Sequence, residues 1–190
     1  MEAMPTRRVP PAPLIGIALT GAAVSVALGV YGHDHTPTGK GILDDGLFFS
    51  ATLNFKAWLA TVVVALALFQ AFTALRMFDR IPFPREMPGW FPTAHRVSGM
   101  AAFLISLPVA YQCLWALGFQ FEDAPTRVAA HSVLGCSFYG VFTIKMLLLR
   151  VDGLPKGVLP LVGGLTFSIV VAIWLTSSLW FFDNIGFPSF

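Results

Sequence analysis

Residues Gly157 to Phe182 read GVLPLVGGLTFSIVVAIWLTSSLWFF, a run of 26 residues without one charged side chain. An α-helix needs about 20 apolar residues to cross the roughly 30 Å hydrocarbon core of a bilayer, so this run predicts a transmembrane helix. Transmembrane β-strands would instead give segments of about ten residues with alternating polarity, and the sequence has none. Four earlier stretches share the apolar character of this run, and they cover residues 13–31, 57–75, 97–118 and 128–149.

The composition agrees with five membrane-spanning helices. Of the 190 residues, 56% are hydrophobic and 12% are charged, and the mean hydropathy is +0.73. Soluble domains carry about 25% charged residues, which cover their surface, so a soluble fold is excluded. Of the 22 charged side chains only Lys145 falls inside the five stretches. We therefore predict an all-α integral membrane bundle of five transmembrane helices that forms a single domain over residues 1–190.

Lysine and arginine are distributed unequally between the two sides of the predicted bundle. With the N-terminus in the cytoplasm, nine of these residues face the cytoplasm and three face the opposite side. Cytoplasmic loops carry the excess of positive charge in membrane proteins, so we expect a cytoplasmic N-terminus and an extracytoplasmic C-terminus. These charges lie beside lipid headgroups and imply no nucleic-acid partner. We expect the first stretch to remain uncleaved, because its 19 apolar residues exceed the apolar region of a usual signal peptide.

Small residues recur at four-residue spacing in two of the stretches. Such stripes let a second helix approach closely, and we interpret them as packing faces of the bundle. The alternative interpretation is that these small residues leave room for a flat cofactor, and the spacing alone does not distinguish the two interpretations. The stripes are Gly21, Ser25 and Gly29 in the first stretch, and Ser132, Cys136 and Gly140 in the fourth.

Polar residues within a membrane are costly and usually mark functional sites. His131 lies one turn into the fourth stretch, and Lys145 follows 14 positions later, within about 40° of the same helical face. His95, at the start of the third stretch, and Gln112, near its end, are further polar candidates. If the third and fourth stretches form a hairpin, His95 lies about 30 Å from the level of His131. One haem cannot bridge that distance, so each histidine needs another partner.

The candidate partners of His131 at its end of the bundle are His33 and His35, just beyond the first stretch, or Gln112 and Cys113 in the third stretch. Two imidazoles predict the axial ligands of one b-type haem, with Lys145 or Arg127 balancing its charge. A zinc or copper site is a second candidate, because the cluster His33, Asp34 and His35 offers two imidazoles and a carboxylate, which suit both metals, and His131 is a further ligand candidate. A solvated loop is the alternative for His33 and His35.

Two cysteines, Cys113 and Cys136, fall in the outer halves of the third and fourth stretches. Their levels in the membrane differ by a few residues, so a disulfide needs both side chains to face each other. We expect free thiols, which pack as small apolar groups.

A resemblance to a known family rests on three segments, namely HRVSGMAAF from His95, LPVAYQC from Leu107 and RVAAHSVLGC from Arg127. They resemble an uncharacterised family of actinobacterial multi-pass membrane proteins, and the likeness covers most of the chain. It implies a bacterial plasma membrane location and no established activity. More loosely, the histidine-bearing stretches are similar to b-type transmembrane cytochromes, which carry two histidines on one helix. Lys145 stands in place of the second histidine, so two haems are not expected.

Three hypotheses on function follow from these residues. The first is a membrane component of electron transfer that holds one b-type haem near the outer leaflet. The alternative is a non-enzymatic accessory or structural subunit, which binds other membrane subunits of a respiratory-type complex or a second copy of itself. A transporter or channel is disfavoured, because the sequence lacks an inverted repeat. The sequence also lacks motifs of hydrolases and nucleotide-binding enzymes, so it favours no enzymatic activity.

Overall fold

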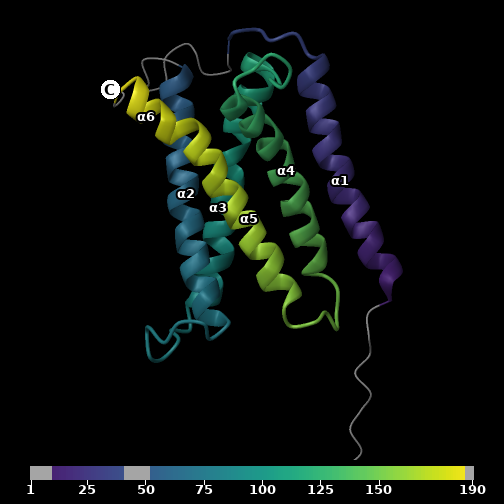
Figure 1. The fold of residues 1–190 in the computed structure, drawn as a ribbon. Helices are drawn as coiled ribbons and strands as arrows, with labels where there is room; N and C mark the ends of the chain where they lie inside the picture. The colour runs from purple at the N-terminus through teal and green to yellow at the C-terminus, as the bar shows by residue number, and fades with distance from the viewer. Residues whose placement is uncertain (1–9, 41–51, 187–190) are drawn as a thin grey trace, which may run out of the picture.

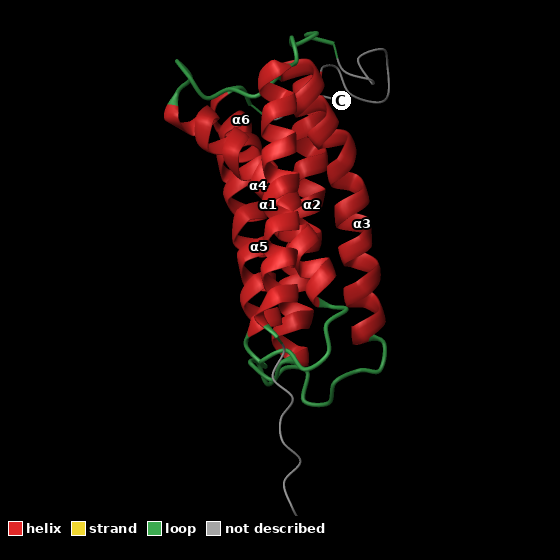
Figure 2. Cartoon of the chain, turned by 90° about the vertical axis from the view of Figure 1, so that its right-hand side faces the viewer, coloured by secondary structure: helices red, strands yellow, loops and turns green. Residues whose placement is uncertain are grey.

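The computed structural model describes residues 10–40 and 52–186, and these residues form helices and loops without a strand (Figures 1 and 2). Five helices are long and apolar enough to cross a membrane, which confirms that part of the prediction. Two of them contain π-helical segments, η1 and η2, near their C-terminal ends. The elements are α1 (Pro11–Asp34), α2 (Thr52–Met77), α3 (Phe91–Tyr111), η1 (Gln112–Leu117), α4 (Thr126–Leu148), α5 (Val158–Trp174), η2 (Leu175–Leu179) and α6 (Trp180–Asn184).

The helices extend beyond the apolar stretches at several ends. The largest difference is in α3, which begins at Phe91 rather than at residue 97. Pro92 lies in the first turn of α3, where a proline costs no hydrogen bond because the first backbone N–H groups of a helix have no partner within it. The first turns of α3 therefore include polar residues, which a hydropathy pattern assigns to the preceding loop.

Close packing joins two pairs of consecutive helices, α2 with α3 and α4 with α5, and two pairs that are not consecutive, α1 with α4 and α2 with α5. In Figures 1 and 2, α1 lies along α4, α2 lies along α3, and α5 crosses between α4 and α2. The predicted hairpin of the third and fourth stretches is antiparallel, as expected. It is wider than a packed hairpin, because the backbones of α3 and α4 scarcely approach within 8 Å of each other.

Aromatic side chains fill the space between α3 and α4 at the level of the membrane centre. The rings of Phe103 and Phe142 stack with centroids 4.5 Å apart. The hydroxyl group of Tyr139 donates to Ser106 of α3 at 3.0 Å, so this buried phenol has a partner. These bulky residues hold the two helices apart.

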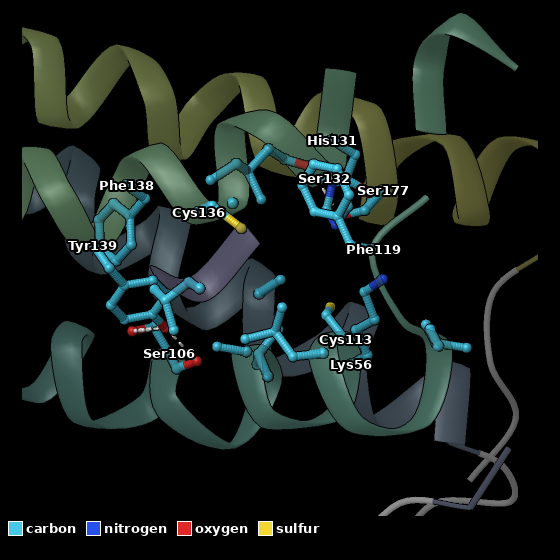
Figure 3. Close-up of a pocket in the computed structure, with 18 of the residues that line it drawn as sticks. Lys56, Ser106, Cys113, Phe119, His131, Ser132, Cys136, Phe138, Tyr139 and Ser177 are labelled. Carbon is cyan, nitrogen blue, oxygen red and sulfur yellow. Dashed lines mark hydrogen bonds between the residues drawn. The ribbon is translucent and has the colours of Figure 1, made fainter. Parts of the chain in front are cut away.

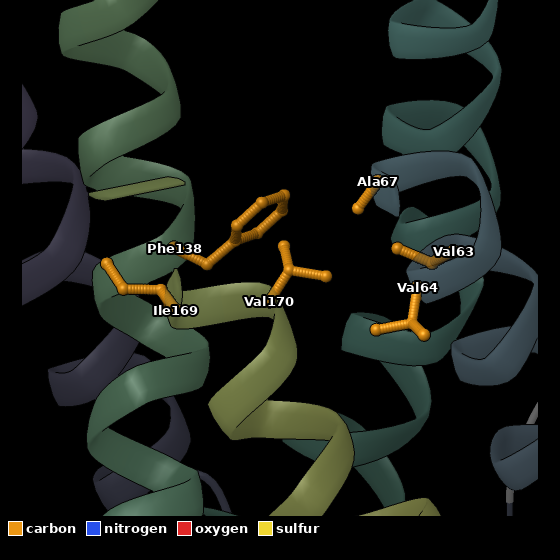
Figure 4. Close-up of a cluster of buried hydrophobic side chains, with 6 residues drawn as sticks. All are labelled: Val63, Val64, Ala67, Phe138, Ile169 and Val170. Atoms are coloured by element: carbon orange, nitrogen blue, oxygen red, sulfur yellow. The ribbon is translucent and has the colours of Figure 1, made fainter. Parts of the chain in front are cut away.

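The centre of the bundle is an apolar cluster formed by α2, α4 and α5 (Figure 4). Its members are almost fully buried, and each helix contributes residues that point toward the other two. They are Val63, Val64 and Ala67 from α2, Phe138 from α4, and Ile169 and Val170 from α5.

Glycine brings α1 and α4 into backbone contact, as the small-residue stripes predict. A Cβ atom added to Gly21 would lie 2.6 Å from the carbonyl oxygen of Gly140, too close for any side chain. A Cβ atom on Gly140 would overlap Ser25 and Gly21 in turn. Gly29 takes no part in this close contact, because the nearest atom to a Cβ atom there belongs to Phe119 and lies 4.0 Å away.

We predict that Gly21→Leu destabilises the protein by about 1–3 kcal/mol, because the added side chain meets backbone atoms that cannot rotate away. Gly16→Leu is the matched control in the same helix, since a Cβ atom there meets nothing within 4 Å. Thermal unfolding of the purified protein in detergent measures both variants. Equal melting temperatures for the two variants would contradict the close contact between α1 and α4.

Candidate functional site

An apolar pocket of about 160 Å³ occupies the gap between α3 and α4 beyond the aromatic residues (Figure 3). Its walls come from α3 with η1 on one side and from α4 on the other, and residues of α1, α2, α5, η2 and the loop after η1 complete them. Tyr139, Phe138 and Ser106 form its deep end, as Figure 3 shows. Lys56 and His131 lie at the opposite end. The pocket exists because the backbones of α3 and α4 do not close on each other.

The two cysteines face this pocket from opposite walls (Figure 3). Cys113 belongs to η1 and Cys136 to α4, and both are free thiols. The prediction of free thiols agrees with the structure. Their sulfur atoms add polarizable, apolar surface to the lining, which suits a hydrocarbon group.

The π-helical segment η1 follows a proline inside α3. Pro108 has no N–H group to donate, and its ring crowds the preceding turn, so the regular ladder of hydrogen bonds is broken there. The backbone N–H of Gln112 then bonds to the carbonyl oxygens of both Pro108 and Val109. The wider turn that follows places Cys113 and Leu117 in the pocket wall. π-Helical turns are rare and occur frequently at functional sites.

The segment η2 has a different local cause. The Thr176 hydroxyl bonds to the carbonyl oxygens of Ala172 and Ile173, and the Ser177 hydroxyl bonds to that of Ile173. Such bonds from side chain to backbone compete with the helical ladder and bend helices. The carbonyl oxygen of Thr176 also has a partner outside its own helix.

That partner is α4, which presents Arg127 and His131 to η2. The guanidinium group of Arg127 donates to the carbonyl oxygen of Thr176 and lies 3.8 Å from the ring centroid of Trp180. The ring nitrogen Nδ1 of His131 lies 3.2 Å from the hydroxyl oxygen of Thr176. Both side chains are therefore fixed against η2, and His131 borders the pocket.

A second cavity of about 460 Å³ adjoins the pocket at this end of the bundle. The two cavities share Lys56, His131 and Ser177 in their walls. We call the second cavity the mouth. Its lining adds polar groups, Arg127 and Ser178 among them, whereas the pocket itself is almost entirely apolar. The combined space has an apolar interior and an opening where polar groups stand among apolar side chains.

The histidines after the first predicted stretch do not line either cavity. His33 is exposed at the end of α1. The ring of His35 stacks between Tyr31, with centroids 5.4 Å apart, and Trp115, with centroids 4.3 Å apart. His33 and His35 lie at the same end of the bundle as His131, but their rings have other surroundings.

The remaining sequence candidates are dispersed. His95 lies at the opposite end, where its Nδ1 is 2.8 Å from the hydroxyl oxygen of Thr73 and its carbonyl oxygen accepts a bond from Gln70. Lys145 lies in the last turn of α4 and does not line the pocket. Gln112 is only 2% exposed, yet it also does not line the pocket. Of the seven predicted residues, only His131 and Arg127 line a cavity together.

The predicted zinc or copper site is not assembled by these residues. Within residues 10–40 and 52–186, no group of three or more histidine, cysteine, aspartate or glutamate side chains is placed to hold a metal ion. His131, His33 and His35 are therefore not a set of three ligands in this arrangement.

Sequence reasoning missed Lys56 and Ser178 as residues of the site. Lys56 directly precedes the second predicted stretch, so it counted as a loop charge, although α2 begins four residues earlier. Ser178 lies in an apolar stretch where serine residues often bond to their own helix. The signal that could have located it is the succession Thr176, Ser177 and Ser178 near the end of a span.

Comparison with known proteins places the chain in a family. Residues 14–189 match the model of one protein family along nearly the whole sequence. The chain belongs to the family of unknown function DUF6529. This agrees with the resemblance to an uncharacterised family. For this DUF6529 protein, neither a curated protein nor a solved structure gives a significant match.

We predict that Arg127 and Trp180 stabilise the protein jointly. In a double-mutant cycle with Arg127→Gln and Trp180→Leu, the coupling energy should be about 0.5–2 kcal/mol, the range of a cation–π contact. The control cycle pairs Arg127→Gln with Trp90→Leu, which lies at the opposite end of the bundle and should be additive. Unfolding of the purified protein measures both cycles. Additivity of the first cycle would refute the contact.

Proposed function

We propose that this protein binds a membrane amphiphile, whose apolar chain occupies the pocket between α3 and α4. The observation that carries this proposal is the apolar pocket itself, which lies within the predicted membrane-spanning part of the bundle. Binding sites for small molecules are concave and mostly apolar, with a few polar groups that set orientation. Here Lys56 and His131 lie at one end, and the hydroxyl groups of Tyr139 and Ser106 at the deep end bond to each other, so the arrangement suits an amphiphile with its headgroup beside Lys56 and His131.

The dimensions of the site agree with a single chain. His131 and Tyr139 lie at the two ends of the pocket (Figure 3). Eight residues of helix separate them, which corresponds to about 12 Å. A cavity of about 150 Å³ holds one benzene molecule, and the present pocket of about 160 Å³ is of that size. One hydrocarbon chain fits such a space in part of its length, whereas two chains do not.

The position of the mouth supports access from the membrane surface. The mouth lies where α4 begins and η2 ends, at one end of the bundle. With the cytoplasmic N-terminus that the Lys/Arg distribution predicts, this end faces the outer side of the membrane. We propose the bacterial plasma membrane as that membrane, on the resemblance to an actinobacterial family. An amphiphile in the outer leaflet would then meet the mouth with its headgroup.

The residues present do not fit the predicted b-type haem. His131 suits an axial ligand, since its hydrogen bond at Nδ1 leaves Nε2 for a metal. Neither His33 nor His35 lines the pocket, and the His35 ring is stacked against Trp115. A porphyrin plane also needs several times the space of one benzene ring. Electron transfer and the likeness to b-type cytochromes remain predictions from the sequence, and the pocket does not favour them.

The accessory-subunit hypothesis is compatible with amphiphile binding. Helix α1 packs against α4 and η1, and many of its apolar residues are exposed on the opposite face. In a membrane, lipid covers such a face as well as another subunit does. Partner subunits and a homo-oligomer therefore stay predictions.

We predict that Gly135→Phe abolishes amphiphile binding. Gly135 lines the pocket, and a Cβ atom there meets nothing within 4 Å, so the new ring would fill the space without striking the backbone. The probe is palmitic acid with a diazirine on its chain, added to protein in lipid nanodiscs. Saturable photolabelling, which excess palmitic acid suppresses, should map to α3 and α4 by mass spectrometry and should be lost in the variant.

The control for this experiment is Gly164→Phe. Gly164 is also helical and open to a Cβ atom, but it lies outside the pocket wall. Its saturable labelling should equal that of the unchanged protein. Saturable labelling that persists in Gly135→Phe, or that never exceeds the non-saturable background, would refute the proposed function. Matching melting temperatures would establish that both variants are folded.

The haem hypothesis has its own test. We expect the purified protein to show no Soret band that depends on His131, because the pocket lacks a second imidazole and the space for a porphyrin. Absorption spectra before and after dithionite measure this in the unchanged protein and in His131→Ala. A Soret band that shifts on reduction and disappears in His131→Ala would restore the haem hypothesis.

A further inference from the structure

Lys56 lies at the junction of the pocket and the mouth, and no charged partner for it is found among residues 10–40 and 52–186. It lines both cavities and is half-buried. In the part of the chain that the structure describes, the one ion pair joins Arg76 to Asp79 at the opposite end of the bundle. Charged side chains within a membrane are normally paired or directed into a polar cavity. Lys56 therefore has the position of a residue that binds an anion.

The neighbouring charges leave Lys56 as the available cation. Arg127 also lines the mouth, but its guanidinium group already bonds to the Thr176 carbonyl oxygen and lies over Trp180. His131 is held by the hydroxyl group of Thr176. Asp123 is the acidic residue in the mouth lining, and it is exposed on the loop between η1 and α4. The inner part of the mouth is thus basic.

Ser178 supplies an independent observation at the same place. Its side chain is 1% exposed, it lines the mouth, and its hydroxyl oxygen has no hydrogen-bond partner among the described residues. A buried hydroxyl group without a partner is unfavourable by about 1–3 kcal/mol. A ligand oxygen in the mouth would remove that cost by accepting a hydrogen bond from Ser178.

We propose that the mouth binds the acidic headgroup of a single-chain amphiphile, with Lys56 as the cationic ligand and Ser178 as a hydrogen-bond donor. The proposal rests on the proposed function, because the apolar pocket takes the chain of the same molecule. The shared chemistry is an anionic oxygen group, which a carboxylate or a phosphate monoester supplies. The width of the pocket restricts the ligand to one chain.

The test compares three probes that share one diazirine-bearing hexadecyl chain and differ in headgroup: the fatty acid, the alkyl phosphate and the fatty alcohol. Each is titrated against the full-length protein in nanodiscs of neutral lipid, and the saturable photolabelling gives its apparent Kd. A hydrogen bond to a charged group strengthens binding by about tenfold or more. We expect at least one acidic probe to bind about tenfold more tightly than the alcohol, and the tighter acid identifies carboxylate or phosphate as the source.

Substitutions assign the preference to residues. Lys56→Gln should bring the acidic probes to the affinity of the alcohol, while Lys56→Arg should keep the preference. Lys145→Gln is the matched control, since Lys145 also lies on a membrane-spanning helix but lines neither cavity. It should leave all three affinities unchanged. Ser178→Ala should weaken the acidic probes by about threefold or more, and it keeps the proposal falsifiable if Lys56→Gln does not fold.

The outcomes separate this proposal from the one on which it rests. If the alcohol binds the unchanged protein as tightly as both acids, the headgroup assignment is wrong and the apolar pocket remains a binding site. If the acidic preference survives in both Lys56→Gln and Ser178→Ala, the assignment to these residues is wrong. If none of the three probes labels the protein saturably, the proposed function fails as well.

Discussion

The separation of α3 from α4 by Phe103, Tyr139 and Phe142 is the constraint on which the rest of the structure depends. Van der Waals packing rather than water drives helices together in a bilayer, so the size of the residues at a contact sets the distance between two helices. Glycine brings α1 against α4 to backbone contact. Between α3 and α4, aromatic rings keep the two backbones apart. The bundle is consequently closed on one side of α4 and hollow on the other.

The backbone polar groups around the pocket have hydrogen-bond partners outside their own helices, as a membrane environment favours. Unpaired N–H and C=O groups are costly in hydrocarbon, so helix ends and π-helical turns need partners from elsewhere. The loop after α1 donates from Thr38 and Gly39 to the carbonyl oxygens of Trp115 and Ala116 in η1. Arg127 does the same for Thr176 in η2. The hydroxyl group of Ser178 and the Nε2 atom of His35 differ from these groups, because neither has a hydrogen-bond partner among the described residues.

The five helices could be predicted from the scarcity of charge, because that scarcity is what a bilayer requires of a spanning segment. The start of α3 could not, since a helix continues through polar residues such as His95 after the hydrocarbon core ends. His131 was identified because an ionisable residue inside a span is exceptional. The side chains around His131 could not be predicted, because the level of a residue along the helix axis does not show in which direction the ring of His35 points. Lys56 was not identified, because α2 begins before the apolar stretch from which this helix was predicted, and Lys56 lies in that extension.

The segment η2 also has a consequence for the length of the chain. A π-helical turn contains one residue more than an α-helical turn, so residues 175–179 amount to a single-residue insertion in an otherwise continuous helix. Deleting one residue there would let α5 and α6 run on as one regular helix. Trp180 and Phe181 would then rotate by about 100° about the axis, which would carry Trp180 away from Arg127. The number of residues between Ala172 and Trp180 therefore helps to set the shape of the mouth, in addition to the side chains that line it.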